Sequence, residues 1–363
     1  MKHLEAISIA IQTGIPVMLW GDPGTGKSSF VNALAKSLDR HLETFIASIH
    51  DPVDLSGAIM ADGDRAKYLL PDWAYRLIKA KNGILFLDEL STAPPSMQAG
   101  VLRVLLEHYV GAEPLPEGTS YICAGNPVET AAGGFELSAP LANRVCHIDW
   151  KSNSQDWVIG MLSGFKLPNV PKLPKDWKKF EAITRGEVTS FIQNQPQMLL
   201  QVPKEESKKG LAWASPRTWD MAIKLMAGCR SVGINGDVEH ALLAGSVGDD
   251  TAITFMNWRK SLDLPNPEDL IANPKKLKLS KKRPDLNFAI LNSVCSAVIQ
   301  NNTPERWEKA MEVMIEASKQ EAGDQAAISL RVILDSSVRK DLTYKVPKGF
   351  FEAFKTFADA NSK

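Results

Sequence analysis

The chain has 363 residues, of which 44% are hydrophobic and 23% are charged. This length is about two to three times that of a typical domain, so we expect one core domain plus a second. The composition is that of an ordinary folded protein and excludes the disordered, fibrous and disulfide-scaffold classes. Lys plus Arg and Asp plus Glu both number 42, and the net charge of zero argues against a typical nucleic-acid binder.

The cysteines and the start of the chain narrow the class further. The four cysteines lie far apart and form no CxxC pair, so we expect reduced, mostly buried thiols. Glu5 places an acid among the first residues, unlike the charged and then apolar pattern of an export signal. No apolar run approaches the roughly 18 residues needed to cross a bilayer. We therefore expect a cytoplasmic protein without membrane contact.

The first 150 residues alternate between short apolar runs and helical patterns. A mixed helical pattern covers residues 4–12, and further helices are predicted at residues 29–39 and 95–108. Strands are predicted at residues 15–20, 44–49, 84–87, 121–124 and 145–148. Strands alternating with helices predict an α/β fold with a parallel five-stranded sheet.

Strand signals fade after about residue 150, and helical patterns take over. A proline-rich stretch at residues 167–174 is predicted to be a linker. Helices are predicted at residues 216–229, 238–244, 252–261, 286–300, 305–319 and 325–338. The second half of the chain is therefore expected to be helical.

Residues 21–28 fit the pattern GxxxxGK[ST], after a predicted strand and before a predicted helix. Glycines let such a loop bend around phosphates and direct its N–H groups at them, and the helix N-terminus adds a favourable dipole. Lys27 is expected to meet the β- and γ-phosphates of ATP, and Ser28 a magnesium ion. The predicted ATP-binding residues are Gly21, Asp22, Pro23, Gly24, Thr25, Gly26, Lys27, Ser28 and Ser29. A plain tight turn is the alternative.

A second motif supports the nucleotide site. The apolar run at residues 84–87 ends in two acids, Asp88 and Glu89. Asp88 is expected to hold magnesium and Glu89 to polarise the attacking water, because phosphoryl transfer needs charge neutralisation and an oriented nucleophile. A solvated helix cap is the alternative. The two motifs together predict magnesium-dependent ATP hydrolysis.

Three further segments follow in an order typical of one superfamily. Residues 121–127 form a strand ending in the polar Asn126, residues 137–145 end near Arg144, and residues 214–218 read Ala-Ser-Pro-Arg-Thr. These segments resemble sensor 1, the arginine-finger segment and the sensor 2 helix of AAA+ ATPases. Residues 51–57 and a hairpin-like stretch at 109–118 add a similarity to the MoxR family, which covers roughly residues 14–230.

The resemblance implies a domain plan and an assembly. It implies an AAA+ P-loop NTPase core at residues 1–152, an α-helical lid with sensor 2 at residues 153–262, and a C-terminal helical extension at residues 263–363. It also implies a homo-oligomeric ring, usually hexameric, that remodels or activates a protein client in a chaperone-like way. Members of this family often act with a von Willebrand factor A domain protein.

The resemblance also implies roles for three residues. Asn126 would lie beside the γ-phosphate, Arg144 would act on the ATP of the neighbouring subunit, and Arg217 would project from the lid towards the γ-phosphate. Arginine suits such roles because its fixed fork and permanent charge stabilise phosphate oxygens. Arg103 is the alternative finger.

Two weaker signals and two rival functions remain. The loop at residues 54–64 is expected to face a central pore, or to be an ordinary exposed hairpin. The basic run Lys275, Lys276, Lys278, Lys281, Lys282 and Arg283 fits nucleic acid, an acidic partner or a solvated loop. One rival function is a nucleic-acid motor or restriction-type translocase. The other is a nucleotide-gated scaffold, which would need a damaged Glu89 or Arg144.

Overall fold

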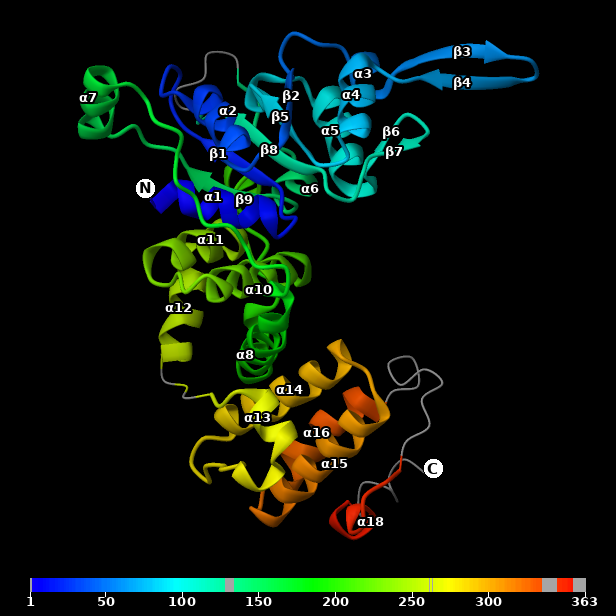
Figure 1. The fold of residues 1–363 in the computed structure, drawn as a ribbon, viewed down its shortest axis with the longest axis vertical. Helices are drawn as coiled ribbons and strands as arrows, with labels where there is room; N and C mark the ends of the chain where they lie inside the picture. The colour runs from blue at the N-terminus through cyan, green and yellow to red at the C-terminus, as the bar shows by residue number, and fades with distance from the viewer. Residues whose placement is uncertain (1, 128–133, 261, 263, 335–344, 355–363) are drawn as a thin grey trace. The chain divides into compact units, whose positions relative to one another are not determined.

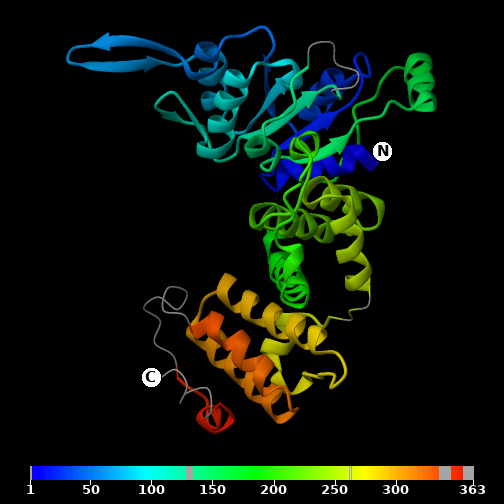
Figure 2. The ribbon, with the colours of Figure 1, turned by 180° about the vertical axis from the view of Figure 1, so that it is seen from behind.

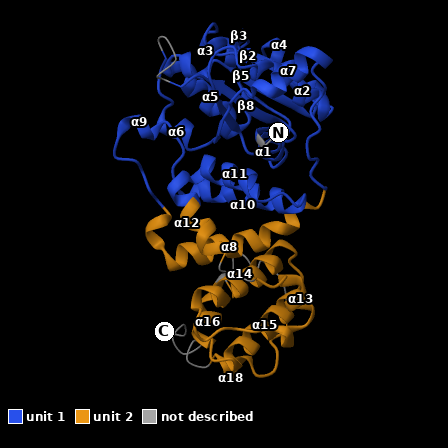
Figure 3. Cartoon of the chain, turned by 90° about the vertical axis from the view of Figure 1, so that its left-hand side faces the viewer, with its two compact units in different colours: residues 1–174, 200–252 blue, residues 175–199, 253–363 orange. Residues whose placement is uncertain are grey.

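The structure is a computed structural model that describes residues 2–127, 134–260, 262, 264–334 and 345–354. Packing divides the chain into two compact units (Figures 1 and 3). Unit 1 comprises residues 1–174 and 200–252, and unit 2 comprises residues 175–199 and 253–363. Packing thus groups the residues differently from the three predicted domains. The division of the chain at residues 152 and 262 stays a prediction.

Unit 1 is built on a five-stranded parallel sheet with strand order β2-β5-β8-β1-β9 (Figures 1 and 2). Val17 of β1 lies opposite Ile122 of β8 on one side and Cys146 of β9 on the other. The strands are β1 (Val17–Trp20), β2 (His41–Ile46), β5 (Gly83–Asp88), β8 (Ser120–Gly125) and β9 (Cys146–Asp149). The predicted fold class is confirmed.

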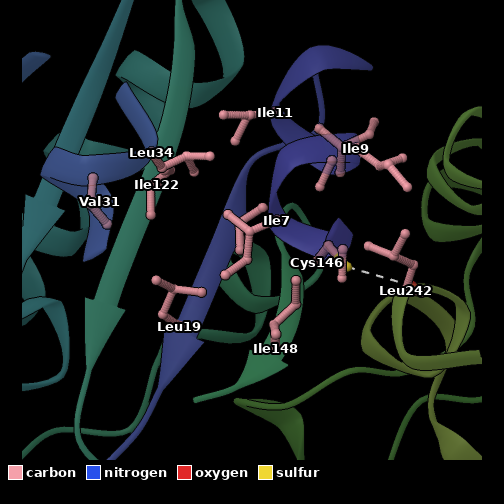
Figure 4. Packing of buried hydrophobic residues seen from close by; sticks show 14 of the residues in the cluster. Ile7, Ile9, Ile11, Leu19, Val31, Leu34, Ile122, Cys146, Ile148 and Leu242 are labelled. Atoms are coloured by element: carbon pink, nitrogen blue, oxygen red, sulfur yellow. Dashed lines mark hydrogen bonds between the residues drawn. The ribbon is translucent and has the colours of Figure 1, made fainter. Parts of the chain in front are cut away.

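Helices cover both faces of this sheet because its strands are apolar on both. Along β8, Ile122 and Ala124 face one core, whereas Tyr121 and Cys123 face the other, as expected for alternating side chains. Figure 4 shows the first core, to which Ile7 also contributes. The helices of unit 1 around the sheet are α1 (Lys2–Gln12), α2 (Lys27–Ser37), α3 (Pro52–Ser56), α4 (Asp72–Ala80), α5 (Pro95–Glu107), α6 (Ala139–Ala142), α9 (Glu206–Lys209), α10 (Pro216–Ser231) and α11 (Asp237–Val247), with a 3₁₀ turn at Leu90–Thr92.

The predicted strand at residues 44–49 is misplaced by three residues. The observed strand β2 starts at His41 and includes Glu43, which is buried and accepts two hydrogen bonds from Arg76 at 2.9 and 2.8 Å. After Ile46 the chain turns, so that Ile49 is 71% exposed. The polar residues at the start of β2 do not look like a strand in the sequence. Glu43 can be buried there only because Arg76, 33 residues away, neutralises its carboxylate.

Two hairpins and one helix project from unit 1. The hairpin β3 (Ala58–Asp62) to β4 (Arg65–Leu69) extends outward and is exposed along nearly all its length (Figure 1). A smaller hairpin joins β6 (Tyr109–Val110) to β7 (Glu113–Pro114), as the pattern at residues 109–118 predicts. Helix α7 (Ser154–Ser163), which the sequence analysis missed, stands off the sheet.

The proline-rich stretch at residues 167–174 is fixed to α1 rather than being a free linker. Pro171 O accepts hydrogen bonds from Ser8 Oγ at 3.0 Å and Gln12 Nε2 at 2.8 Å, and Leu173 N donates to Gln12 Oε1 at 3.0 Å. Val170 is buried in the core of unit 1. These contacts hold the stretch in one path.

Unit 2 is helical in the residues that the structure describes. Its core surrounds Trp307, and α8 approaches α14 closely because Gly186 lies against Ser293, where an added Cβ would come within 2.7 Å. The sequence analysis missed α8, and the part of its predicted helix 325–338 after residue 334 lies outside the described residues. The elements are α8 (Glu181–Asn194), α13 (Pro267–Ala272), α14 (Pro284–Gln300), α15 (Pro304–Lys319), α16 (Gly323–Leu334) and α18 (Phe350–Ala353), with 3₁₀ turns at Trp177–Phe180, Pro196–Met198 and Pro274–Lys276; α12 (Asp249–Lys260) runs from unit 1 into unit 2.

The thiols and the helices agree with two sequence expectations. Cys123, Cys146, Cys229 and Cys295 are all buried, and none of them forms a disulfide. Burial raises the pKa of the Cys123, Cys146 and Cys295 thiols to about 12. Across the part of the chain that the structure describes, no helix is long and apolar enough to span a bilayer.

Candidate nucleotide site

The loop between β1 and α2 adopts a conformation that favours glycine. Gly24 has a φ of 75° and Gly26 a φ of 86°, which L residues with side chains rarely adopt. Gly21 is needed for a different reason, since an added Cβ would lie 2.6 Å from the carbonyl oxygen of Trp150. Gly24 and Gly26 therefore allow the loop to bend, and Gly21 allows it to approach the backbone of Trp150 closely.

Trp150, which follows β9, holds this loop in place. Its indole Nε1 donates to Thr25 O at 3.0 Å, and its ring stacks on Phe30 of α2 with centroids 4.6 Å apart. Within the loop, Thr25 Oγ1 donates to Asp22 O at 2.7 Å. The sequence analysis missed Trp150 because its partners are more than 100 residues away.

The ammonium group of Lys27 is buried at the centre of the site. Its Nζ donates to Gly21 O at 2.6 Å, to Asp22 O at 3.1 Å and to Asn126 Oδ1 at 3.0 Å. Burial lowers the pKa of Lys27, and the nearby Asp88 and Asp22 carboxylates oppose that effect. The structure thus brings Lys27 and Asn126 together, 99 residues apart in sequence.

Ser28 and Asp88 meet beside Lys27. Ser28 Oγ donates to Asp88 Oδ2 at 2.7 Å, and the backbone N–H of Glu89 donates to Asp88 Oδ1 at 2.9 Å. A hydroxyl and a carboxylate supply the hard oxygen ligands that Mg²⁺ prefers, and Mg²⁺ usually takes its remaining ligands from water and phosphate. The residues present therefore fit a magnesium nucleotide, whose metal ion Ser28 and Asp88 would hold.

Glu89 points to a partner that the sequence analysis did not identify. Its carboxylate Oε2 accepts a hydrogen bond from Ser48 Oγ, which lies in the turn after β2. The backbone of Glu89 has a φ of 56°, a conformation that costs a residue with a side chain about 1 kcal/mol. Ser48 and this backbone together fix the direction of the carboxylate.

Asn126 is also held by an unforeseen residue. Its backbone N–H donates to Ser91 Oγ at 2.9 Å, and Ser91 is fully buried in the 3₁₀ turn that follows Glu89. Ser91 therefore links the ends of β5 and β8. Because these strands are parallel neighbours, their carboxyl ends deliver Asp88 and Asn126 to one edge of the sheet.

Arg144 and Arg217 lie near each other in this chain. Ser215 Oγ donates to Asn143 Oδ1 at 2.8 Å, which fastens the start of α10 to the segment before β9. Burial lowers the pKa of Arg144, and the charge of Arg217 lowers it further. Arg144 Nη1 donates to Pro140 O at 2.6 Å, whereas its buried Nε has no hydrogen-bond partner among the described residues.

Arg103, the alternative finger, has other partners. Its Nε donates to Glu107 Oε2 at 3.0 Å on the same helix, and its Nη2 donates to Gly111 O at 3.2 Å. These contacts fix Arg103 to α5 and to the β6–β7 hairpin.

His147 of β9 is partly buried and lies three residues after Arg144. Its Nδ1 accepts from Trp20 Nε1 at 2.9 Å, so its Nε2 carries the proton that it donates to Ala142 O at 2.9 Å. Burial lowers the pKa of His147 to about 4, against the opposing effects of the Ala142 carbonyl and Asp149. The imidazole is therefore neutral at pH 7.

Comparison with known proteins places this site in context. Residues 16–145 match the family described as AAA domain (dynein-related subfamily). The chain is 31% identical over 151 residues to a Nif-specific regulatory protein of Sinorhizobium fredii, covering 39% of this chain and 25% of that protein. It is 32% identical over 137 residues to the Psp operon transcriptional activator of Escherichia coli K12, covering 35% of this chain and 41% of that protein.

A solved structure also aligns with this chain. A candidate ATPase from Cytophaga hutchinsonii aligns with a TM-score of 0.49 at 15% identity, over 70% of this chain and 87% of that chain. The chain spans about a quarter of the length of the first of the curated relatives.

Proposed function

Given the AAA+ ATPase-type domain at residues 16–145, we propose that this chain hydrolyses ATP with Mg²⁺ as part of a homo-oligomeric ring and thereby remodels a protein client. One observation carries the enzymatic part of the proposal. Lys27, Ser28, Asp88 and Asn126 come from three separate segments, and hydrogen bonds join Lys27 to Asn126 and the adjacent Ser28 to Asp88. A structural turn needs no such convergence of an ammonium, a hydroxyl, a carboxylate and an amide.

The chemistry assigns each group a task. The loop N–H groups and Lys27 bind the phosphates, and Ser28 and Asp88 hold the magnesium ion, which supplies charge neutralisation when bound. Glu89 orients a water molecule and accepts its proton as the water oxygen bonds to the γ-phosphorus. The bond to the bridging oxygen breaks, and ADP and phosphate leave.

Arg144 and Arg217 are proposed to act together on one ATP. Their proximity, which the Asn143–Ser215 hydrogen bond maintains, argues that both guanidinium groups belong to the same site. Arg144 Nη1 donates to Pro140 O of its own segment, whereas Lys27 Nζ donates to Gly21 O, Asp22 O and Asn126 Oδ1. We therefore assign both arginines to the ATP of the neighbouring subunit, rather than assigning Arg217 to the ATP of its own subunit.

The exposed apolar surface of α7 supports assembly with further copies of the chain. We define the α7 surface as the seven large apolar side chains Trp157, Val158, Ile159, Met161, Leu162, Phe165 and Leu167, which are 46% to 84% exposed. All seven lie between residues 157 and 167, and such a concentration of exposed apolar side chains is typical of an interaction surface. α7 follows Trp150 and so continues from the residue that holds the phosphate loop.

The client is proposed to be a protein, contacted through the β3–β4 hairpin. Ile59 and Met60 of β3 are more than half exposed, so this projecting hairpin offers apolar side chains along its strand. The sequence resemblance to MoxR ATPases supports a von Willebrand factor A domain protein as the partner. Capture with Glu89→Gln in the presence of ATP tests this proposal, and recovery of no such protein from the native host would count against it.

Steady-state ATPase measurements test the enzymatic proposal. Lys27→Ala should abolish tight ATP binding, whereas Glu89→Gln should bind ATP normally and lose turnover by at least about a hundredfold, because it removes only the proton acceptor. Nucleotide affinity is measured separately with a fluorescent ATP analogue. Wild-type turnover that survives in Glu89→Gln would exclude the assigned role of Glu89.

Control of transcription is a second candidate for the output. The relatives that share the AAA region include proteins named regulatory protein and transcriptional activator. If capture with Glu89→Gln recovers a component of the transcription apparatus, this candidate is favoured over a von Willebrand factor A domain partner.

A further inference from the structure

We propose that unit 2 binds the phosphodiester backbone of duplex nucleic acid through a basic ridge on the segment that joins α13 to α14. The basic ridge consists of Lys275, Lys276, Lys278, Lys281, Lys282 and Arg283. This segment lies beside the yellow helices of Figure 1, within unit 2. The inference concerns a part of the chain that the proposed ATPase function does not use.

The ridge is held rigidly, unlike an ordinary solvated loop. Leu277 is buried and Leu279 is half-buried, so the segment is anchored from below while its lysines point into solvent. Gln320 clamps the backbone at two points, accepting from Leu279 N at 3.0 Å and donating to Leu277 O at 2.9 Å.

Asn287 clamps the ridge further along. Its Oδ1 accepts from Ser280 N at 2.9 Å and its Nδ2 donates to Ser280 O at 3.0 Å. Asn287 is itself buried and also donates to Gln325 Oε1 at 3.0 Å. Asn287 of α14 and Gln320, the residue after α15, thus hold the basic segment in one shape, which lowers the entropy lost on binding.

The charge of the ridge is only partly neutralised. Lys281 pairs with Glu321 at 2.7 Å and Arg283 with Asp285 at 2.8 Å. Lys275, Lys276, Lys278 and Lys282 are exposed and form no ion pair among the described residues. Four positive charges therefore remain available on a fixed backbone.

The two units also differ in total charge, which the zero net charge of the chain conceals. Unit 2 contains 22 Lys and Arg residues against 17 Asp and Glu residues, whereas unit 1 contains 20 against 25. The basic ridge thus lies on the positively charged unit, where it attracts an anionic partner over a longer range.

The surroundings of the ridge favour nucleic acid over an acidic protein. Protein interfaces rest on a few buried aromatic or apolar anchors. Among the described residues from 254 to 327, no large hydrophobic side chain is exposed. A surface of lysines without such anchors fits a phosphate backbone, where binding comes from the release of counterions. Residues 274–283, which carry the ridge, include no aromatic residue for base stacking, and this favours a duplex over a single strand.

Fluorescence anisotropy with a labelled 25-base-pair DNA duplex and the full-length protein tests the inference. Four phosphate contacts predict a slope of about −3.6 for the logarithm of affinity against that of salt, or roughly a hundredfold loss from 50 to 200 mM. The Lys275→Gln, Lys276→Gln, Lys278→Gln, Lys282→Gln variant should bind at least about tenfold more weakly, with a slope close to zero.

The controls separate this inference from general charge and from the ATPase proposal. A variant with Lys79→Gln, Lys166→Gln, Lys172→Gln and Lys204→Gln makes the same change in charge on unit 1 and should keep full affinity. Lys27→Ala should also bind the duplex normally, so a failed ATPase assignment would leave this result intact. Unchanged thermal unfolding of the ridge variant confirms that it folds.

Three outcomes would overturn the proposal: no salt-dependent binding by the wild type, equal losses in the ridge and control variants, or full binding by the ridge variant. Competition by polyglutamate as strong as that by unlabelled duplex would also overturn it, because the partner would then be an acidic polypeptide.

Discussion

At the scale of single residues, Ser48 is expected to control the catalytic carboxylate. Its hydroxyl donates to Glu89, and Glu89 in turn is fixed by its backbone conformation. Ser48→Ala should lower kcat about tenfold without changing ATP affinity, because the carboxylate loses its orientation while the phosphate contacts remain. Single-turnover hydrolysis and equilibrium ATP binding separate the two quantities.

A matched variant distinguishes orientation from a general loss of structure. Ser48→Thr keeps the hydroxyl and should retain most of the turnover. Faster hydrolysis by Ser48→Ala would contradict the prediction and would mean that the hydrogen bond restrains Glu89 rather than aims it.

The partly buried His147, whose two ring nitrogens are both hydrogen-bonded, predicts a dependence of stability on pH. Its pKa in the folded chain is about 4, below the ordinary value of 6.5, so the unfolded chain takes up a proton first as the pH falls. The contribution of the neutral imidazole to the free energy of unfolding is fully present above pH 6.5. It is lost between pH 6.5 and 4, by about 3 kcal/mol in all. Urea unfolding at pH 7.5 and 4.5 measures the loss.

His147→Gln provides the reference for this measurement, since an amide has an acceptor and a donor but does not titrate. Carboxylates contribute equally to the pH dependence of both proteins, so the difference between them isolates the imidazole. Identical pH dependence in the two would rule out a buried neutral histidine at this position.

Residue contacts of this kind could not be predicted from the sequence. The glycine-rich motif predicted Lys27 and Ser28, and the acidic pair predicted Asp88, from short-range patterns, and the structure brings Ser28 and Asp88 into contact. Ser91 and Trp150 act through partners 35 and 125 residues away, and serine and tryptophan have no pattern that marks such contacts. Only the folded sheet brings them to the site.

At the scale of elements, α7 carries the prediction for assembly. If active sites form only in an assembled ring, the ATPase rate per subunit should rise with protein concentration. Ile159→Glu with Leu162→Glu places two charges on the α7 surface. These charges would be buried in an interface and destabilise it, so the rise in rate should disappear. Activity across a range of protein concentrations, together with light scattering, measures the effect.

The control for α7 alters the same helix without removing apolar area. Gln155→Glu with Ser163→Glu adds two charges at polar positions and should leave the concentration dependence intact. Wild-type behaviour by the Ile159 and Leu162 variant would show that α7 does not contact a second copy.

The elements that the sequence predicted well share a physical feature. β5 and β8 are apolar on both faces, and α14 and α15 have long helical patterns that end at prolines or polar residues. By contrast, α7 exposes its apolar side chains and α8 places Gly186 against α14, so neither shows the one-sided pattern of a surface helix.

At the scale of the whole molecule, the proximity of Arg144 and Arg217 makes the strongest prediction. Arg144→Ala and Glu89→Gln should each be inactive alone, but an equal mixture should recover about a quarter of wild-type activity. Random neighbours in a closed ring would place an intact Glu89 beside an intact Arg144 in one pairing of four.

A second mixture tells which ATP Arg217 serves. If both arginines act on the neighbour, Arg144→Ala mixed with Arg217→Ala has no complete site and stays inactive. If Arg217 serves its own subunit, the same mixture recovers about a quarter of the activity, as random pairing requires. Lack of rescue in both mixtures would contradict shared sites and favour a self-contained monomer.

The four buried thiols make the native chain a convenient host for site-specific labels. A maleimide reacts with a thiolate, and the Cys123, Cys146 and Cys295 thiols are both inaccessible and, with pKa values of about 12, protonated at neutral pH. A single cysteine introduced on the β3–β4 hairpin would therefore carry a dye selectively without removal of any native thiol. Single-molecule spectroscopy could then follow the hairpin through individual rounds of nucleotide turnover in an otherwise unaltered protein.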